Sequence, residues 1–248
     1  MKTNVVAVIN QKGGTGKTTT TINLGSALSK LGKKVLLIDL DPQSNLSYSL
    51  AVSNTDATLA DVFQGDKGLN DILVEKNGLW VAPGSNDLVD IEISLVSQPE
   101  REKFLKSILA KVKGFDFVLI DCPPSLSVLT LNALTAAQEV LIPLQMEVLT
   151  LQGLDQITKT VQKVKKALNP KLKIKGIVVV MFDVRRKLSQ EVLEYLQDNV
   201  QEKIFRSQIR MNVKLAEAPS FGKSVLDYDA SSNGARDYAA LAEEYLEA

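Results

Sequence analysis

Carboxylates follow two strongly apolar segments of this chain, and a glycine-rich loop follows a third. The segment KVLLIDLD ends with Asp39 and Asp41, and the segment FDFVLIDCPP contains Asp121. Carboxylates at the ends of buried strands can hold Mg²⁺ or orient a water molecule for attack on a phosphate. The loop NQKGGTGKTTT, which begins at Asn10, contains residue types that bind phosphate. These residues together predict a nucleotide site with a metal ion.

The loop departs from the common phosphate-binding pattern G-x-x-x-x-G-K-[ST]. Counted back from Gly16, the first glycine of that pattern falls at position 11, where this chain has Gln11. The next residue is a lysine, Lys12, and the end of the pattern is intact in Lys17 and Thr18. The site is therefore either damaged or equipped with a second cation.

Each loop residue can be given a physical task. Glycines let the backbone wrap around phosphate oxygens that a Cβ would obstruct, and a helix that begins inside the loop turns its positive end toward the anion. Lys17 suits the β- and γ-phosphates, and the Thr18 hydroxyl suits Mg²⁺. A glycine-rich turn without a ligand is the alternative. We predict these residues as nucleotide contacts: Lys12, Gly13, Gly14, Thr15, Gly16, Lys17, Thr18 and Thr19.

Apolar segments alternate along the chain with segments of helical periodicity. We expect strands at 5–10, 34–41, 78–83, 115–124, 139–145 and 173–182. We expect helices at 17–31, 101–113, 127–137, 151–168, 188–199 and 234–247, with small helices and loops at 44–77. Continuous Val, Ile and Leu runs are typical of strands covered on both faces. The alternation predicts one α/β domain over residues 1–248, with a doubly wound, mostly parallel sheet and helices on both faces.

The composition excludes several classes of site. The chain has 29 basic and 29 acidic residues, no histidine and one cysteine, Cys122. Histidine-based zinc sites, Ser-His-Asp catalysis and a disulfide framework within one chain are therefore excluded. No apolar run reaches the roughly 18–20 residues that a membrane span needs, and the first residues, MKTNVVAVIN, do not form a signal peptide. We expect a cytoplasmic protein.

Several motifs give the chain a family resemblance. The motifs KGGTGKTT, DLDPQ and DFVLIDCPP resemble those of the deviant Walker A ATPases, the P-loop NTPases of SIMIBI type that include ParA/Soj, MinD and the nitrogenase iron protein. The later segments LIPLQMEVLTLQGL, MFDVRRKLS and NVKLAEAPSFGKSVLDYDASSNGARDY are similar to ParA/Soj partitioning proteins. The resemblance covers almost the whole chain except the stretch around 44–77, and we expect no helix-turn-helix before the P-loop strand.

The resemblance implies a role for each charged residue of the site. In this family the lysine at the position of Lys12 crosses a dimer interface and contacts ATP in the partner subunit. Two facing nucleotides concentrate negative charge that a second lysine can neutralise. The family implies that ATP and Mg²⁺ are bound, that Lys12, Lys17 and Asp41 are catalytic, with Asp41 orienting the water, and that Thr18, Asp39 and Asp121 hold the metal. Lys12 as an ordinary exposed lysine is the alternative.

The base site is implied by the same resemblance. Asn212 resembles the residue that recognises the adenine edge, because an amide can both donate and accept hydrogen bonds. Many relatives have proline two positions earlier, where this chain has Arg210. Arg210 could stack on the base, bind DNA or point to solvent. Glu147 could face the nucleotide or the dimer partner, or it could cap helix 151–168.

Basic residues are concentrated in one part of this neutral chain. Ten lie between Lys159 and Lys187, where Asp183 is the one acid, and the distribution indicates a basic face. Arg185 and Lys214 match positions at which relatives contact the DNA backbone. The solvated faces of helices are the alternative. We predict these residues as contacts for non-specific double-stranded DNA: Arg185, Arg186, Lys187, Lys214 and Lys223.

The resemblance therefore predicts a ParA-type ATPase with weak basal activity. Its ATP-bound homodimer would bind the nucleoid, and a ParB-like centromere-binding protein would stimulate hydrolysis and release it, which drives chromosome or plasmid segregation. The alternative is an orphan ParA-type ATPase that positions a protein cargo, such as a carboxysome or chemotaxis array, through a cargo adaptor. A MinD-like membrane switch is disfavoured because the C-terminal helix DYAALAEEYLEA is acidic.

Overall fold

A seven-stranded sheet forms the centre of the computed structural model, which describes residues 3–147 and 150–247. The strand order is β3-β4-β2-β5-β1-β6-β7, and every pair is parallel except β3 with β4. The strands are β1 (Asn4–Val8), β2 (Val35–Asp39), β3 (Val74–Lys76), β4 (Leu79–Ala82), β5 (Phe117–Asp121), β6 (Glu139–Gln145) and β7 (Lys173–Val180).

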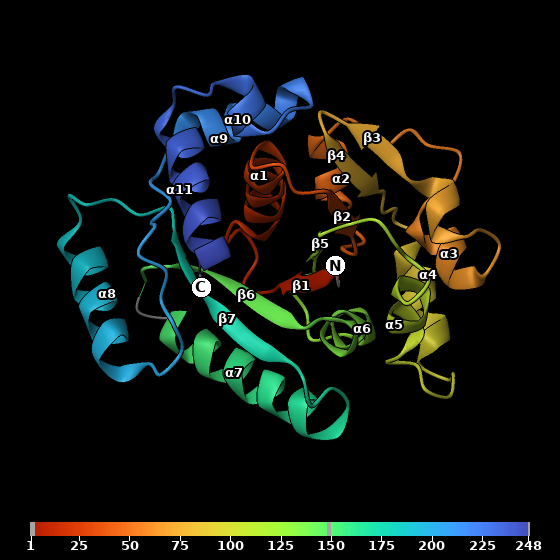
Figure 1. Ribbon diagram of the computed structural model, residues 1–248. Coiled ribbons are helices and arrows are strands. Elements are labelled where there is room, and N and C mark those ends of the chain that lie inside the picture. The colour runs from red at the N-terminus through yellow and green to blue at the C-terminus, as the bar shows by residue number, and fades with distance from the viewer. Residues whose placement is uncertain (1–2, 148–149, 248) are drawn as a thin grey trace.

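Helices cover both faces of this sheet because both faces of the central strands are apolar. Successive side chains of a strand point to opposite faces, so Val6 and Val8 pack with α1 and α11, whereas Val5 and Ala7 pack with the helices on the other side. β2 and β5 are buried at every position. In Figure 1, α1 and α11 lie on one side of β6 and β7, and α6 and α7 lie on the other.

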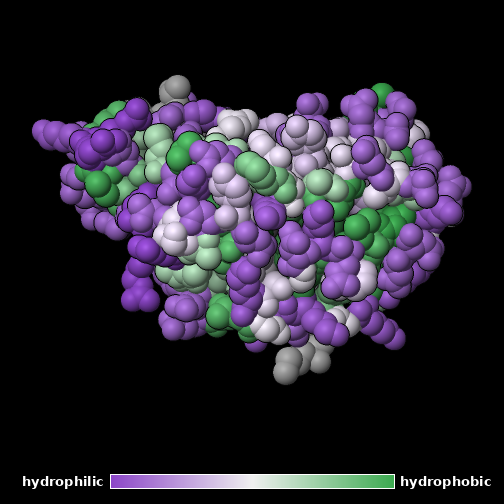
Figure 2. All heavy atoms as spheres, turned by 90° about the horizontal axis from the view of Figure 1, so that it is seen from above, coloured by the Kyte–Doolittle hydropathy of each residue, from purple (hydrophilic) through white to green (hydrophobic). Residues whose placement is uncertain are grey.

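The helices of the described residues range from single turns to five turns. They are α1 (Lys17–Lys30), α2 (Asn45–Ser49), α3 (Leu59–Gln64), η1 (Leu69–Ile72), α4 (Leu88–Leu95), α5 (Phe104–Leu109), α6 (Val128–Ala136), α7 (Thr150–Ala167), α8 (Lys187–Asn199), α9 (Val213–Glu217), η2 (Ala218–Phe221), α10 (Val225–Tyr228) and α11 (Asn233–Glu247). Seen from above, hydrophilic residues cover most of the surface, with smaller hydrophobic areas between them (Figure 2).

The predicted fold class is confirmed, and the differences are local. The antiparallel edge strand β3 lies in the stretch where loops and small helices are expected, and α4 has no predicted counterpart. The α4 pattern is visible afterwards, because Leu88, Ile91 and Leu95 are its buried residues and follow helical spacing. The helix expected at 101–113 is shorter, since α5 covers only Phe104–Leu109.

The strand order brings the predicted site together at the carboxyl edge of the sheet. β5 lies between β1 and β2, so that Asp121 is in register with Val8 on one side and with Asp39 on the other. The loop after β1 and the carboxylates after β2 and β5 therefore share one crevice, as the parallel arrangement predicts.

Candidate functional site

The glycine-rich loop leads from β1 into the start of α1. Gly14 and Gly16 both have φ of 73°, in the left-handed region that favours glycine. A Cβ built on Gly13 or Gly14 would meet nothing within 4 Å, so these two glycines leave open space beside the loop. α1 begins at Lys17 directly after Gly16, and its unpaired N–H groups and positive dipole end face this space.

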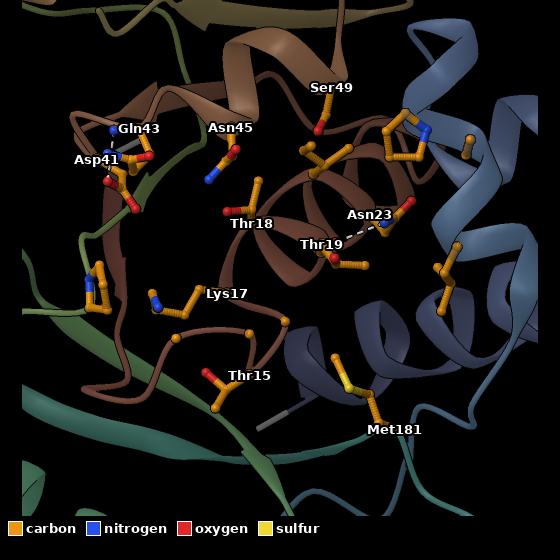
Figure 3. Close-up of a pocket in the computed structure, with 18 of the residues that line it drawn as sticks. Thr15, Lys17, Thr18, Thr19, Asn23, Asp41, Gln43, Asn45, Ser49 and Met181 are labelled. Atoms are coloured by element: carbon orange, nitrogen blue, oxygen red, sulfur yellow. Dashed lines mark hydrogen bonds between the residues drawn. The ribbon is translucent and has the colours of Figure 1, made fainter. Parts of the chain in front are cut away.

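The loop forms one wall of a pocket of about 440 Å³, within the range of small-molecule sites. Figure 3 shows Lys17 and Thr18 pointing into it, with Asp41 and Gln43 on one side and Met181 below. Ala218 and Pro219, at the start of η2, line another side. The pocket is lined by Gly13, Gly14, Thr15, Gly16, Lys17, Thr18, Thr19, Ile22, Asn23, Asp41, Gln43, Asn45, Ser49, Pro124, Met181, Leu215, Ala218, Pro219 and Lys223.

Two buried carboxylates lie behind the loop. The Thr18 hydroxyl donates to Asp121 Oδ2 at 2.6 Å, and both the amide and the hydroxyl of Ser47 donate to Asp39 Oδ2, at 2.8 and 2.6 Å. The other oxygen of each carboxylate is buried and has no hydrogen-bond partner among the described residues. Buried carboxylate oxygens without partners are costly unless a cation binds nearby. The donor set of Thr18, Asp39 and Asp121 therefore fits a magnesium ion.

Burial dominates the electrostatics of this pair. Burial raises the pKa of Asp39 to about 6, although the hydrogen bonds from Ser47 partly oppose the shift. Burial also raises the pKa of Asp121 well above its usual value, and the neighbouring charge of Asp39 adds to the rise. Two adjacent carboxylates in a dry environment resist being charged together. A cation that binds beside them would lower both pKa values.

Asp41 is placed differently from the other two carboxylates. It lines the pocket, although only 7% of it is exposed. The backbone N–H of Gln43 donates to its Oδ1 at 3.0 Å, which fixes the orientation of the carboxylate (Figure 3). Asp41 and Lys17 therefore line the same pocket.

The second lysine of the loop does not line the pocket of its own chain. Lys12 Nζ lies 2.6 Å from Glu147 Oε2, and the two side chains are 49% and 45% exposed. The Lys12 carbonyl faces inward instead, where it accepts from Lys17 Nζ at 3.5 Å. The sequence interpretation left the role of Glu147 open, and the structure pairs it with Lys12.

A smaller pocket of about 240 Å³ adjoins the first and contains the predicted base contacts. It shares Gly16 and Met181 with the larger pocket and is lined also by Arg210 and Asn212. Arg210 Nη2 donates to Asp237 Oδ1 at 2.6 Å, and its Nε donates to both oxygens of that carboxylate. The guanidinium is therefore held against α11 and does not point freely into solvent.

Asn212 has a structural task as well as a place in the smaller pocket. Its Oδ1 accepts from the backbone N–H of Lys214 at 2.8 Å and caps the start of α9. The side-chain amide keeps its N–H donors for other partners.

The predicted DNA contacts occupy two different places. Arg185 and Arg186 are exposed in the loop between β7 and α8, and Lys187 is exposed at the start of α8. Within the loop, Asp183 binds the Arg185 guanidinium at 2.9 and 3.0 Å. Lys214 pairs with Glu217 at 2.8 Å, and Lys223 lines the larger pocket.

The ten basic residues between Lys159 and Lys187 are spread over α7, the turn after it, β7, the loop after β7 and the start of α8. β7 separates the lysines of α7 from Arg185, because Lys173 begins that strand and Arg185 follows its end. A basic face over this run stays a prediction.

Several polar residues of the site lie in the stretch expected to be small helices and loops. Asn45 and Ser49 line the pocket, Ser47 donates hydrogen bonds to Asp39, and Gln43, directly before this stretch, also lines the pocket. The sequence DPQSNLS contains a usable signal, because polar residues directly after a buried parallel strand lie at the carboxyl edge of the sheet. Asn23 also lines the pocket from the second turn of α1.

Comparison with known proteins places this chain. A family model described as "AAA domain" matches residues 3–174. The chromosome-partitioning ATPase Soj of Treponema pallidum (strain Nichols) is 47% identical over 241 residues, which cover 96% of this chain and 95% of that protein. The chromosome partitioning protein ParA of Caulobacter vibrioides (strain NA1000 / CB15N) is 45% identical over 98% of this chain and 93% of that protein. The chain belongs to the ParA/Soj family of ATPases.

A solved structure agrees with the fold of this ParA/Soj chain. It is described as cobyrinic acid a,c-diamide synthase from Mycobacterium smegmatis with bound ATP analogue and magnesium. Its TM-score is 0.88 at 38% identity, over 99% of the ParA/Soj chain and 95% of that protein. Among the described residues of the ParA/Soj chain, no helix combines the length and the apolar character that crossing a bilayer requires.

Proposed function

We propose that this chain is a single ParA-type ATPase domain whose ATP-bound form is a sandwich dimer that binds DNA without sequence preference. The observation that carries the proposal is the different placement of two lysines of one loop. Lys17 lines the pocket, whereas Lys12 presents its ammonium group at the surface, outside the lining of its own pocket. A lysine in that position can serve a nucleotide bound to a second copy.

The pocket residues support a hydrolytic mechanism. The backbone N–H groups of the loop and the Lys17 ammonium would bind the phosphates, and Asp41 would orient water for attack on the γ-phosphorus. The attack forms a bond from water oxygen to phosphorus and breaks the bond to the β-phosphate oxygen, which leaves ADP and phosphate. Thr18, Asp39 and Asp121 would hold Mg²⁺, which supplies positive charge to the phosphate oxygens. Loss of the γ-phosphate removes the charge that attracts Lys12 of the other copy, so the dimer dissociates.

Partition is the biological role that the relatives support best. The partition ATPases are 47% and 45% identical to this chain, whereas the relative with the cobyrinic acid name is 38% identical. We therefore propose that the ATP dimer resides on the nucleoid through Arg185, Arg186, Lys187 and Lys214. A ParB-like, centromere-bound partner would stimulate hydrolysis and release the dimer, which moves a chromosome or plasmid.

Two substitutions test the switch. Lys12→Ala should leave ATP binding by the monomer within about threefold of wild type but abolish the nucleotide-dependent dimer, measured by light scattering with a non-hydrolysable ATP analogue. Asp41→Ala should bind ATP and dimerise, yet lower the hydrolysis rate by at least about a hundredfold, in line with the loss of a group that orients the attacking water.

The dependence of DNA binding on the bound nucleotide tests the same switch. Random-sequence duplex should bind tightly with the ATP analogue and weakly with ADP, and Asp41→Ala with ATP should match the analogue. An unchanged analogue-dependent dimer of Lys12→Ala would refute the role of Lys12 across the interface. Normal turnover by Asp41→Ala would refute the assignment of the water-orienting residue.

A further inference from the structure

The end of α7 and the turn into β7 carry a cluster of exposed lysines that the site described above does not use. We define the α7–β7 cluster as Lys163, Lys165, Lys166 and Lys171, all exposed. Lys163 and Lys166 are three residues apart on one helix and therefore neighbours on its surface. The turn after α7 brings Lys171 to the same tip, because the N–H of Asn169 bonds back to the Val164 carbonyl and the N–H of Leu172 bonds to the Asn169 carbonyl.

The cluster differs from several other exposed lysines in having no acid paired with any of its members. Lys12, Lys30, Lys159, Lys187 and Lys214 each form an ion pair with a carboxylate. No ion pair joins any member of the α7–β7 cluster to an acid in residues 3–147 or 150–247. The sequence gives the reason, because no Asp or Glu lies between Asp155 and Asp183.

Neighbouring cations add to the positive charge at this end of the sheet. Lys173 and Lys175 begin β7, and Glu139 is within 3.1 and 3.8 Å of their ammonium groups. Glu139 is 5% exposed and also accepts from Tyr245. Burial holds the pKa of Lys175 below its usual value, and although Glu139 opposes the shift, the charges of Lys173 and Lys203 add to it. Lys173, Lys175 and Lys203 therefore outnumber the one carboxylate, Glu139, that pairs with the first two.

The cluster lies far from the other predicted DNA contacts. β7 has eight residues, so its two ends are separated by about 23 Å at roughly 3.3 Å per residue. In Figure 1 the end of α7 lies at the bottom of the view, whereas the loop from β7 to α8 lies at the left. This separation exceeds the Debye length of about 8 Å at physiological salt. The α7–β7 cluster and the residues Arg185–Lys187 therefore act as independent sites.

We propose that the α7–β7 cluster is a second binding surface for the phosphate backbone of double-stranded DNA, at the opposite end of the sheet from Arg185–Lys187. The inference rests on the proposed DNA-binding function. Closely spaced ammonium groups without acids suit a polyanion, and they carry no means of reading base sequence. A lipid surface is a poorer fit, because none of the exposed large hydrophobic side chains comes from residues 150–180.

The test compares two triple variants of the full chain. The first is Lys163→Gln with Lys166→Gln and Lys171→Gln. The matched control is Lys106→Gln with Lys111→Gln and Lys113→Gln, three exposed lysines of the α5 region that lose the same charge. Binding to random-sequence duplex is measured with the ATP analogue across a salt series, and thermal unfolding confirms that both variants fold.

Each phosphate contact contributes about −0.9 to the slope of log K against log salt. We expect the first variant to have a slope shallower by about 2 to 5 and an affinity lower by at least about tenfold near 100 mM salt, whereas the control stays close to wild type. Equal slopes for wild type and the first variant, or equal changes in both variants, would overturn the proposal.

Two further measurements distinguish the proposal from a membrane-binding role and from failure of the ATP switch. Sedimentation with vesicles of anionic phospholipid should detect no difference between wild type and the first variant. A loss of vesicle binding with an unchanged DNA slope would assign the cluster to a membrane and overturn the proposal. If the wild type binds DNA equally with the analogue and with ADP, the ATP switch fails, but the slopes of the variants still decide the role of the cluster.

Discussion

At the scale of single residues, the contact between Lys12 and Glu147 is the feature with the clearest consequence. An ion pair between two half-exposed side chains contributes only about 0.2–1 kcal/mol. Such a pair is strong enough to hold the lysine in one orientation and weak enough to be exchanged for a phosphate. In the proposed dimer, both copies must give up this contact before their lysines reach the opposite nucleotides.

Glu147→Gln should therefore favour the dimer. Without the competing carboxylate, we expect the dissociation constant of the analogue-bound dimer to fall by about two- to tenfold, since two pairs of under about 1 kcal/mol each no longer have to break. Analytical ultracentrifugation gives the constant. Glu191→Gln, which removes the exposed partner of Lys187 on α8, is the matched control and should leave it unchanged. A weaker dimer for Glu147→Gln would mean that the carboxylate positions Lys12 rather than competing for it.

Asp39 makes the stability of the nucleotide-free protein depend on pH. Its pKa is about 6 in the folded protein, above the ordinary 3.8. Between these two pH values, the folded state therefore holds a proton that the unfolded state has released. The stabilising contribution of the neutral form is complete below about pH 4 and is lost as the pH rises through 6. The shift corresponds to about 3 kcal/mol, at roughly 1.4 kcal/mol per pKa unit.

Asp39→Asn should therefore raise the free energy of unfolding of the nucleotide-free protein by about 1–3 kcal/mol at pH 8 and by much less at pH 4.5. Urea titrations without magnesium at both pH values measure this difference. Addition of Mg²⁺ with the ATP analogue should stabilise the wild type more than the variant, because the variant lacks one of the charges that the ion neutralises. A variant less stable than wild type at pH 8 would contradict the assignment of an uncompensated buried charge.

At the scale of elements, short segments complete the pocket. η2 packs against α2, and the turn after η2 lies against the turn after α2, since a Cβ on Gly222 would lie 2.9 Å from the Ala51 Cβ. Lys223, which follows Gly222, lines the same pocket as the glycine-rich loop. Lys223 was predicted as a DNA contact from its place in a basic set of the sequence, and its position favours a role in nucleotide binding.

Lys223→Gln should weaken the binding of ADP and of the ATP analogue by about three- to tenfold, because one charge near the phosphates and ribose is lost. DNA affinity at saturating analogue should stay at the wild-type value. Isothermal titration calorimetry measures the first quantity and fluorescence anisotropy the second. Lys67→Gln, an exposed lysine of the α3–η1 turn, serves as control. Reduced DNA affinity with unchanged nucleotide binding would restore the original DNA assignment.

The sequence predicts long elements and strand ends better than it predicts short connections. β1, β2 and β5 are continuous apolar runs, so their identity as buried parallel strands and the meeting of Asp39 with Asp121 follow from pattern alone. α2 has five residues, too few for a periodic signal, and its N-cap residue Ser44 has φ of 51°. Its place beside the pocket depends on Ser47 bonding to Asp39, a tertiary contact that no local pattern encodes.

At the scale of the whole molecule, the neutral net charge conceals a separation of charges. The α7–β7 cluster has no acid paired with any of its members, whereas Arg185 and Lys214 near the carboxyl edge of the sheet are paired with carboxylates of their own chain. DNA that binds at the carboxyl edge must therefore replace internal partners of these cations. Hydrogen bonds from Arg185 hold the pKa of Asp183 at about 2, so this carboxylate stays ionised at any working pH and competes with DNA for the guanidinium.

Asp183→Asn should release Arg185 and tighten the binding of random-sequence duplex to the analogue-bound protein by about three- to tenfold near 100 mM salt. Two arginines per dimer then become available, and the salt slope should steepen by about 2, at about 0.9 per phosphate contact. Arg185→Ala should change both quantities in the opposite direction, and the double variant should resemble Arg185→Ala, because Asp183 acts through the arginine. If Asp183→Asn tightens DNA binding even when Arg185 is absent, the effect is one of general charge, and Arg185 is not a backbone contact.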